Sequence, residues 1–344
     1  MKCPLVSIIT PCYNGEQFLD KYFKSILAQT YNPLELVFVN DGSTDRTEEI
    51  ALSYQRALKK RGIVYKYLYQ PNSGQAKAMN TGFRVMTGKY LVWPDSDDLL
   101  APDSIEKRVN LLETHPEYDF VRTSGDFFNF ETGERIGTVN YYGDASSEDI
   151  FLDLILENTY CACGCYMIKT EMLRQIYPDL KIYETDVGQN WQILIPISGR
   201  GKCGYIDEEL YHIAVRKDSH SRHKRSLQEM VNRQLELKKV LEIGIEQSGR
   251  QDREYQKIVD MKYQHVLYSI YLNEGAFEEA KACYDVLHAE NEVKVNEYCQ
   301  YLQIWHPIRY KVYCIKNLVL RVIRKIKKIL FDEEEVYVTN KKSL

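Results

Sequence analysis

Short apolar runs alternate with apolar residues at helical spacing along the first hundred positions of the 344-residue chain. The runs predict strands at 5–10, 34–40, 63–69 and 89–94, and the segments between them predict helices at 16–29, 45–61 and 75–87. Strands that alternate with helices form βαβ units, in which the strands are parallel and the crossovers right-handed. We therefore expect an α/β fold in which flanking helices cover a mostly parallel central sheet.

The pattern changes twice after residue 100. Up to residue 224 it is mixed, and it predicts helices at 102–114 and 189–198 and strands at 118–131, 135–142, 161–168 and 203–213. Beyond Arg225, charged and apolar residues alternate at helical spacing through 226–246, 252–272 and 276–289. We therefore predict three parts, 1–100, 101–224 and an α-helical C-terminal extension over 225–344.

The extension contains a segment, 309–331, with the pattern of a basic amphipathic helix. On a helical projection its apolar residues share one face, and lysines and arginines cover the other without an intervening acid. Such a helix can lie in the anionic inner leaflet of a membrane, although a helix that packs its apolar face on the protein is the alternative. No run of about 18 apolar residues occurs and no secretory signal precedes the first strand, so we expect a cytoplasmic protein with peripheral membrane contact at most.

Composition narrows the classes of function. Hydrophobic residues make up 44% of the chain, enough for a sizeable core, and the net charge of -4 argues against a nucleic-acid binder. The cysteine count of nine is odd and shows no paired framework, which favours a reducing compartment. Cys161, Cys163 and Cys165 form a cluster that lacks the two-residue spacer of zinc sites, so we favour core or strand thiols over a metal there.

Polar segments follow three of the first four predicted strands, where open α/β sheets bind their ligands. The segments are 10–15, 40–45 and 95–98. In the last of them Asp95, Asp97 and Asp98 place three carboxylates within four positions, and these repel one another unless a cation lies between them. Hard oxygen ligands of this kind suit Mg²⁺ or Mn²⁺. The plainer alternative is an acidic turn that caps the next helix at Asp103.

Several ordered motifs lie within these hundred residues, namely Val6–Gly15, Ser25–Tyr31, Val39–Asp45, Asn72–Gly74 with Asn80–Gly82, and Asp95–Asp98. Together they resemble the motifs of family 2 glycosyltransferases, which are inverting enzymes with the Rossmann-like GT-A fold. The resemblance implies a nucleotide-sugar donor, with UDP as the expected carrier, a bound Mn²⁺ or Mg²⁺, and transfer of the sugar to an acceptor hydroxyl. It also implies that 1–100 is the half that binds the nucleotide sugar and 101–224 the half that binds the acceptor.

The resemblance assigns roles to single residues. Those that fall where the family lines its base and ribose pocket are Thr10, Pro11, Tyr13 and Asp41. Asp95 faces the sugar or ribose, and the metal ligands are Asp97 together with Asp95. Further candidates for binding the sugar donor are Asn14, Asn72, Gly74, Lys77 and Ser96.

A basic, hydroxyl-rich segment follows the last strand predicted before residue 224. It resembles the loop that closes over the diphosphate in similar enzymes, and its candidates for that contact are Arg216, Ser219 and Ser221. His220, ahead of His212, is a candidate to complete the metal shell. A solvated linker is the alternative interpretation of the segment.

The general base is where the chain departs from the family. Relatives carry an acidic pair before a tryptophan, and the matching segment here is Gln189-Asn190-Trp191, whose amides cannot accept a proton as a carboxylate does. Asp186 is the preferred base, followed by Glu184, and Asn190 is the remaining catalytic candidate. Both acids are also compatible with an ordinary surface position.

The leading interpretation is an inverting, metal-dependent glycosyltransferase of exopolysaccharide, capsule or lipopolysaccharide assembly, acting on a lipid-linked or polysaccharide acceptor. One rival is a sugar nucleotidyltransferase, but that class carries a Gly-rich, basic loop after its first strand, which 12–16 lacks. The other rival is a nucleotide-sugar-binding scaffold without catalytic activity, an interpretation that Gln189 and Asn190 favour.

Overall fold

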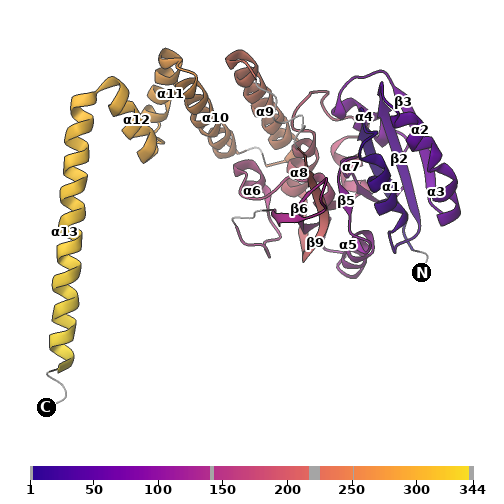
Figure 1. The fold of residues 1–344 in the computed structure, drawn as a ribbon, viewed down its shortest axis with the longest axis horizontal. Helices are drawn as coiled ribbons and strands as arrows, with labels where there is room; N and C mark the ends of the chain where they lie inside the picture. The colour runs from indigo at the N-terminus through magenta and orange to yellow at the C-terminus, as the bar shows by residue number, and fades with distance from the viewer. Residues whose placement is uncertain (1–2, 140–142, 217–224, 251, 341–344) are drawn as a thin grey trace. The chain divides into compact units, whose positions relative to one another are not determined.

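The structure is a computed structural model that describes residues 3–139, 143–216, 225–250 and 252–340 of the chain. The chain divides into two compact units, Met1–Tyr263 and Gln264–Leu344. The first unit is built from strands and helices, and the second is helical (Figure 1).

One sheet forms the centre of the first unit. Its strand order is β3-β2-β1-β4-β8-β6-β9-β5, and β7 pairs with β6. In chain order the strands are β1 (Val6–Cys12), β2 (Leu34–Asp41), β3 (Val64–Gln70), β4 (Tyr90–Val92), β5 (Leu99–Leu100), β6 (Phe120–Asn129), β7 (Arg135–Thr138), β8 (Tyr166–Lys169) and β9 (Cys203–Val215). The four strands from the first hundred residues that lead the order are parallel, as expected, whereas β8 is antiparallel to both β4 and β6. The sheet is therefore mixed beyond its parallel half.

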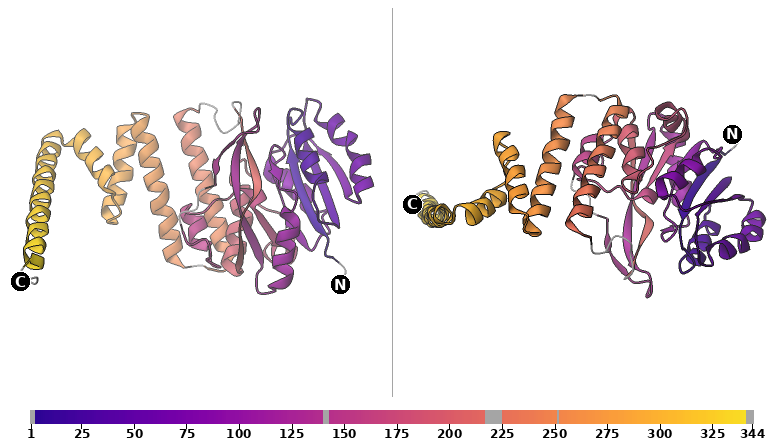
Figure 2. Two further views of the ribbon diagram at one scale, coloured as in Figure 1. Left: turned by 60° about the horizontal axis from the view of Figure 1, so that its bottom comes forward. Right: turned by 90° about the horizontal axis from the view of Figure 1, so that it is seen from above.

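The strand order reverses after β3. The chain crosses the sheet from β1 to β2 to β3 and then returns to place β4 on the other side of β1. Because such crossovers are right-handed, α1 (Leu19–Leu27), α2 (Thr47–Ser53) and α3 (Gln55–Arg61) cover one face and α4 (Gln75–Phe83) covers the other (Figure 2). The carboxyl ends of β1 and β4 flank the point of reversal, which is where open sheets of this kind bind ligands.

The elements predicted in the first hundred residues form close to their expected bounds. β1 and β2 are buried along their whole length, which explains why their sequences are continuous apolar runs. The one difference is that the helix predicted at 45–61 is divided into α2 and α3 at Tyr54.

Between residues 101 and 224 the predicted helices and strands also form, as α5 (Ser104–Thr114), β6, β7, β8, α8 (Gln189–Arg200) and β9. Two elements of this range have no counterpart in the prediction, namely α6 (Phe151–Leu156) and α7 (Thr170–Ile176), and neither does β5 just before it. The strand expected at 161–168 begins only at Tyr166, because Cys163–Cys165 form a 3₁₀ turn that packs on Tyr211. A Cβ on Gly164 would lie 2.0 Å from the Tyr211 ring, and both flanking cysteines are buried.

The first unit extends beyond residue 224, where the sequence analysis placed the start of the helical extension. α9 (Leu227–Ser248) packs closely on α8 (Figure 1). Glycines allow this approach, since a Cβ on Gly199 of α8 would lie 2.4 Å from the Cβ of Ser248. The first unit therefore includes α9 and the start of α10 (Arg253–Asn273). The separation of 1–100 from 101–224 as functional halves stays a prediction.

The second unit contains the end of α10, α11 (Phe277–Ala289), α12 (Val295–Trp305) and α13 (Pro307–Asn340). Its core includes a stack of Tyr284 on Tyr301, whose ring centroids are 3.9 Å apart. α13 covers the segment predicted as a basic amphipathic helix. Its exposed apolar side chains include Ile308, Val312, Ile315, Leu318, Val319 and Val322. Among the helices of the described residues, none combines the length and apolar character needed to cross a membrane.

Candidate active site

A cavity of about 240 Å³ lies at the reversal point of the strand order, and we name it the strand-end cavity. Residues from the ends of β1, β2, β4 and β9 line it together with residues that begin α1 and α4. The lining residues are Pro11, Cys12, Tyr13, Phe18, Asp41, Gln75, Asp95, Ser96, Asp97 and Arg216. Elements separated by about two hundred positions in the chain therefore meet at one site.

The loop after β1 supplies one wall of the strand-end cavity. Pro11 and Tyr13 line it, and the Tyr13 ring is 41% exposed, so it can contact a ligand directly. Thr10, predicted to bind the base or ribose, is fully buried; its hydroxyl bonds to the Tyr22 hydroxyl and donates to the Pro94 carbonyl oxygen at 3.2 Å. Asn14 accepts a 2.8 Å bond from the Thr44 backbone N–H. Thr10 and Asn14 thus hold neighbouring segments in place and do not line the strand-end cavity.

Asp41 at the end of β2 organises the turn that opens α4. Its carboxylate accepts hydrogen bonds from the backbone N–H groups of Ser73 at 3.0 Å and Gly74 at 2.9 Å, and from the Gln70 side-chain amide at 2.7 Å. Gly74 has a φ of +88°, a conformation that a residue with a Cβ rarely adopts. Asp41 therefore lines the cavity and also fixes the first residues of α4 beside it.

Asp95, Asp97 and Asp98 follow β4, and we name these three carboxylates the acidic cluster. They have different roles. Asp95 and Asp97 line the strand-end cavity, whereas Asp98 is buried and points away to β9. Its carboxylate accepts bonds from the Tyr211 hydroxyl at 2.6 Å and the Ala214 backbone N–H at 2.8 Å. Burial, and then the charges of Asp97 and Asp95, raise the pKa of Asp98 well above its ordinary value. Asp98 thus fastens β9 to the cluster.

The Asp95 carboxyl group is shielded from water and lies near the charge of Asp97. Loss of solvent, followed by the negative charge of Asp97, raises the pKa of the Asp95 carboxyl to about 6. The Gln75 side-chain amide donates a 2.8 Å hydrogen bond to Asp95 Oδ1. The charge of Asp97 therefore disfavours an ionised Asp95 unless a cation or hydrogen-bond donors offset it. The cation expected from the sequence stays a prediction.

Arg216 supplies a positive charge opposite the cluster. Its guanidinium forms an ion pair with the Asp97 carboxylate and lies 4.6 Å above the centre of the Phe18 ring. The Nε atom of Arg216 is buried without a hydrogen-bond partner among the described residues. Arg216 is the last described residue before 225, and the other predicted residues of its segment, Ser219, His220 and Ser221, lie outside the described residues. His212 is paired instead with Asp126.

The first turn of α8 approaches the acidic cluster from the other side. The Gln189 amide donates a 2.7 Å bond to Gln75 Oε1, and Asn190 Oδ1 accepts a 3.0 Å bond from the Trp93 indole N–H. The amides that stand in place of the acidic pair are thus engaged with α4 and with the end of β4. Asn190, one of the catalytic candidates, does not line the strand-end cavity, and its side-chain oxygen is bonded to Trp93.

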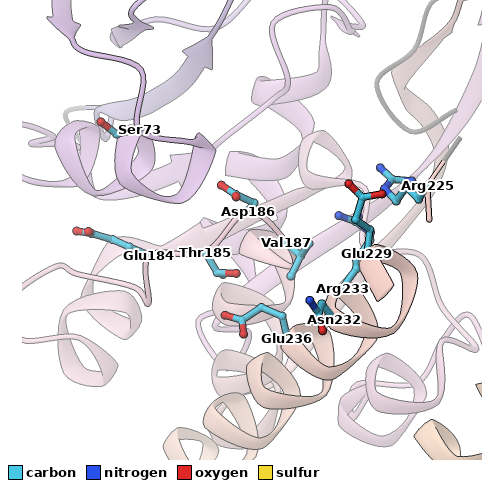
Figure 3. Close-up of a pocket in the computed structure, with 10 residues that line it drawn as sticks. All are labelled: Ser73, Glu184, Thr185, Asp186, Val187, Arg225, Glu229, Asn232, Arg233 and Glu236. Carbon is cyan, nitrogen blue, oxygen red and sulfur yellow. The ribbon is translucent and has the colours of Figure 1, made fainter. Parts of the chain in front are cut away.

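A second cavity of about 570 Å³, which we name the α9 cavity, adjoins the start of α4 (Figure 3). It is bordered by Ser73, by the loop 184–187 and by one side of α9. Its lining residues are Ser73, Glu184, Thr185, Asp186, Val187, Arg225, Glu229, Asn232, Arg233 and Glu236. Four carboxylates and two guanidinium groups surround the space, so it suits a polar, hydroxyl-bearing ligand.

Asp186 lies beside Gly74, which stands in the chain between Ser73 of the α9 cavity and Gln75 of the strand-end cavity. Its Oδ1 is 2.9 Å from the position that a Cβ on Gly74 would occupy, and its carboxylate points toward Ser73 (Figure 3). Asn80 of α4 anchors the preceding chain by exchanging two hydrogen bonds with the Ile182 backbone, at 2.8 and 3.0 Å. Glu184 lines the α9 cavity as well, and its carboxylate is 3.3 Å from Lys181 Nζ. The structure thus brings both predicted acids to one cavity.

Other predicted residues lie outside both cavities. Lys77 is exposed on α4, and Asn72 is exposed in the turn before it; neither lines the strand-end cavity or the α9 cavity. Nothing among the described contacts supports a role for them with the sugar donor. Conversely, the sequence analysis did not name the cavity residues Cys12, Phe18 and Gln75, or any residue of α9. Two of these residues had a signal in the sequence, since Cys12 lies within the Val6–Gly15 motif and Gln75 directly follows the Asn72–Gly74 motif.

The strand-end cavity fits a Mg²⁺ or Mn²⁺ ion that is bound together with phosphates. Within the part of the chain that the structure describes, no group of three or more His, Cys, Asp and Glu side chains could hold a metal alone. Asp95 and Asp97 do present two carboxylates to the cavity. Mg²⁺ commonly takes one or two protein carboxylates and completes its shell with substrate phosphates and water.

Comparisons with known proteins give consistent results. A family model described as "Glycosyl transferase family 2" matches residues 7–177. An uncharacterized glycosyltransferase of Rickettsia prowazekii is 44% identical over 118 residues, covering 34% of this chain and 35% of the relative. Glycosyltransferase GlyA of Streptococcus pneumoniae is 30% identical over 228 residues, covering 63% of this chain and 31% of the relative. The chain spans about a third of the length of these relatives.

Two solved structures have a similar fold. TarS of S. aureus in complex with UDP superposes with a TM-score of 0.56 at 17% identity, covering 86% of this chain and 78% of that chain. The mannosyltransferase PcManGT of Pyrobaculum calidifontis, in complex with GDP-Man and Mn²⁺, superposes with a TM-score of 0.53 at 20% identity. The match covers 92% of this chain and 83% of that chain. At these identities the likeness shows the fold alone.

Proposed function

The chain belongs to glycosyl transferase family 2 and has the GT-A fold, and from this premise we propose that it transfers a sugar from a nucleotide-sugar donor to an acceptor hydroxyl. The observation that carries the proposal is the adjacency of the two cavities across Gly74. One is lined by the acidic cluster that suits a metal diphosphate, and the other by acids that suit a hydroxyl-bearing acceptor. A transferred sugar has to lie between its leaving group and its acceptor, and this arrangement provides that position.

The nucleotide occupies the strand-end cavity in this proposal. The exposed Tyr13 ring and the Asp41 carboxylate lie at the wall formed by β1 and β2, where they contact the base and ribose. UDP is the proposed carrier, supported by the complex of TarS with UDP, while the complex of PcManGT with GDP-Man makes GDP the first alternative to test.

Asp97 and Asp95 are the residues that would hold Mn²⁺ or Mg²⁺ together with the diphosphate. When bound, such an ion neutralises the charge that develops on the leaving diphosphate. Arg216 adds a second positive charge at the same wall, and its stacking on Phe18 directs the guanidinium into the cavity. The part played by His220 in the metal shell stays a prediction from the sequence.

Asp186 is the proposed general base. It takes the proton of the acceptor hydroxyl while the hydroxyl oxygen bonds to C1 of the sugar and the bond from C1 to the diphosphate oxygen breaks. A single in-line displacement of this kind inverts the configuration at C1. Asp186 is favoured over Glu184 because it lies beside Gly74, next to the strand-end cavity, whereas Glu184 is close to Lys181.

We place this activity in the assembly of a cell-surface polysaccharide, with a lipid-linked or polysaccharide acceptor, at the cytoplasmic face of the membrane. The support is α13, whose exposed apolar residues accompany basic residues without an acid between positions 307 and 331. Flotation of the full-length protein with liposomes of anionic and of neutral lipid tests this role. Replacing Arg309, Lys311, Lys316 and Arg321 by glutamine removes half of the eight basic residues between positions 307 and 331 and is expected to weaken flotation with anionic liposomes. Unchanged flotation would discard electrostatic membrane binding.

The proposed activity is tested with a panel of UDP- and GDP-sugars in the presence of Mn²⁺. Thermal stabilisation by one donor identifies the ligand, and release of its nucleoside diphosphate with formation of a glycoside identifies transfer. A donor that stabilises the protein without any transfer or hydrolysis would favour the scaffold alternative, which the amides at 189 and 190 support. Release of a nucleoside monophosphate or triphosphate would instead indicate nucleotidyltransferase chemistry.

A further inference from the structure

Two glutamine side chains form a chain of hydrogen bonds from α8 to the acidic cluster. Gln189 Nε2 donates to Gln75 Oε1 at 2.7 Å, and Gln75 Nε2 donates to Asp95 Oδ1 at 2.8 Å. Both side chains are partly buried, which limits competition from water. The chain links the first residue of α8, the first residue of α4 and the segment after β4.

The direction of each bond follows from the chemistry of its partners. A carboxylate only accepts hydrogen bonds, so Gln75 has to present its NH₂ group to Asp95. Its carbonyl oxygen then faces Gln189 and needs a donor, which a glutamine supplies and a glutamate cannot. The amide at position 189 is therefore suited to this contact in a way that an acid is not.

Asn190 has the complementary role in the same helical turn. The Trp93 indole N–H can only donate, so Asn190 has to present its carbonyl oxygen, and the two atoms are 3.0 Å apart. Two side chains of one turn thus hold both ends of the segment 93–95. This arrangement fixes the direction of the Asp95 carboxylate relative to the strand-end cavity.

The position of these residues indicates which part of the ligand Asp95 contacts. Gln75 and Asp95 line the strand-end cavity, while Ser73 and Asp186 line the α9 cavity, and Gly74 separates the two sets. The base side of the strand-end cavity, at Tyr13 and Asp41, is formed by other strands. Asp95 therefore faces the space between the leaving group and the acceptor, where the transferred sugar lies.

We propose that Gln75 and Gln189 are positioning residues that hold the Asp95 carboxylate against the hydroxyl groups of the donor's sugar. This inference rests on the proposed function and deepens it. The first turn of α8 then serves to orient the sugar, while proton removal is carried out from the loop before it. The inference accounts for amides at both positions without requiring a loss of activity.

Four substitutions in the full-length protein test the proposal. In Gln189→Leu the Gln75 amide loses its fixed orientation, and we expect KM for the nucleotide sugar to rise about tenfold, the effect of one hydrogen bond to a charged group. The value of kcat should stay within about threefold, because the sugar contact is lost from the bound substrate and the transition state alike. The affinity for the free nucleoside diphosphate, measured without Mn²⁺, should stay within about twofold, because Asp95 would reach the diphosphate only through the metal. Gln75→Leu should act in the same way.

Gln189→Glu should raise KM more than Gln189→Leu. Its carboxylate draws the Gln75 NH₂ group toward itself and turns the Gln75 carbonyl oxygen against Asp95. Gln75→Lys combined with Gln189→Glu should restore KM toward the wild-type value, because the ammonium group donates to both carboxylates. The matched control is Gln256→Leu, which removes a 2.9 Å amide bond to the Glu242 carboxylate away from both cavities; its KM should equal that of the wild type.

Three results would overturn the inference. They are an unchanged KM in both leucine variants, an equal loss of affinity for the free nucleoside diphosphate measured without Mn²⁺, and an absence of rescue in the double variant. A double-mutant cycle on unfolding with Gln75→Leu and Gln189→Leu tests the hydrogen-bond chain independently of activity, and additive effects would disprove it. If the wild-type protein transfers no sugar at all, the proposed function fails, and the sugar-positioning role fails with it. If the wild type is active and the leucine variants have the same KM, only the role of the two glutamines is rejected.

Discussion

The two cavities of the first unit are built in different ways. The strand-end cavity is walled by buried strand ends whose side chains have fixed partners, such as Asp41 with the turn at Ser73 and Gly74. The α9 cavity is bordered by a loop and by the outward side of α9, and most of its charged residues are exposed. Groups held in fixed positions stabilise a transition state most where charge develops during the reaction. Exposed charges are screened by water and add little interaction energy. This difference fits the proposed division of roles, in which the strand-end cavity carries the sugar-transfer chemistry and the α9 cavity binds the acceptor.

The largest effect is expected from Asp97→Asn in the strand-end cavity. Removing one of two carboxylates that suit the metal should lower kcat/KM about a thousandfold and weaken Mn²⁺-dependent donor binding. Steady-state kinetics and titration calorimetry with and without Mn²⁺ measure this. Asp103→Asn, which removes an exposed carboxylate paired with Lys107 at 2.7 Å, is the control and should retain activity.

Because Asp97 is also paired with Arg216, Arg216→Gln separates the two contributions. That variant should keep its dependence on Mn²⁺, whereas Asp97→Asn should lose it. Equal loss of metal binding in both variants would show that the ion pair, and not metal ligation, accounts for the role of Asp97.

The second-largest effect is expected from replacing Asp186, which lies beside Gly74 at the boundary of the two cavities. Asp186→Asn should lower kcat by about 10² to 10⁴ while leaving calorimetric donor binding unchanged, because it removes the general base and no contact with the nucleotide. Glu184→Gln is the matched control and should have a much smaller effect. A reversed order of the two variants would transfer the role of the base to Glu184.

The third expected effect is on stability at the amino ends of β1 and β2, the edge of the sheet opposite the strand-end cavity. Burial of Glu35 by itself raises its pKa, but bonds from Lys66, Thr87 and Ser7 outweigh it and lower the pKa below the ordinary value of 4.5. The ionised carboxylate therefore contributes stability above pH 4.5, and this contribution is lost as the pH falls through 4.5 and below. Glu35→Gln should lower the free energy of unfolding by about 2–4 kcal/mol at pH 7.

The pH dependence identifies the cause of that loss. Urea unfolding at pH 7 and near pH 4 should show the difference between Glu35→Gln and the wild type shrinking at the lower pH. If the variant and the wild type differ by the same free energy of unfolding at both pH values, the loss would come from the shape of the side chain and not from its charge.

The smallest effect is expected at the wall formed by α9. Glu236→Gln should change KM for the acceptor by less than about tenfold and leave KM for the sugar donor unchanged, since partly exposed charges are screened by water. Kinetics with each substrate varied in turn measure this. A change in donor KM would contradict the separation of the two cavities.

Much of the strand-end cavity was predictable because its residues are local in sequence. Asp41, Asp95 and Asp97 each follow an apolar strand directly, and parallel strands bring their carboxyl ends to one edge of a sheet. Arg216 was also predicted, although its partner Asp97 lies 119 positions away. Thr10 shows the limit of this reasoning, because its motif position did not reveal that its side chain faces the core.

The α9 cavity was not predictable in the same way. Helical periodicity identified α9 as a helix, but the same periodicity is compatible with an independent extension or with packing on α8. The close approach through Gly199 and Ser248 depends on side-chain shapes far apart in the chain. Glu229, Asn232 and Glu236 therefore carried no signal of their position beside Asp186.

The sequence by itself determined the order of the elements, the parallel half of the sheet and the acidic cluster at its edge, because strand and turn preferences act over a few neighbouring residues. Only the tertiary structure decided which carboxylate faces the cavity and which fastens β9, that Gln189 reaches Asp95 through Gln75, and that α9 closes a second cavity. These outcomes depend on packing and hydrogen bonds between distant segments, and residue type and spacing do not specify them.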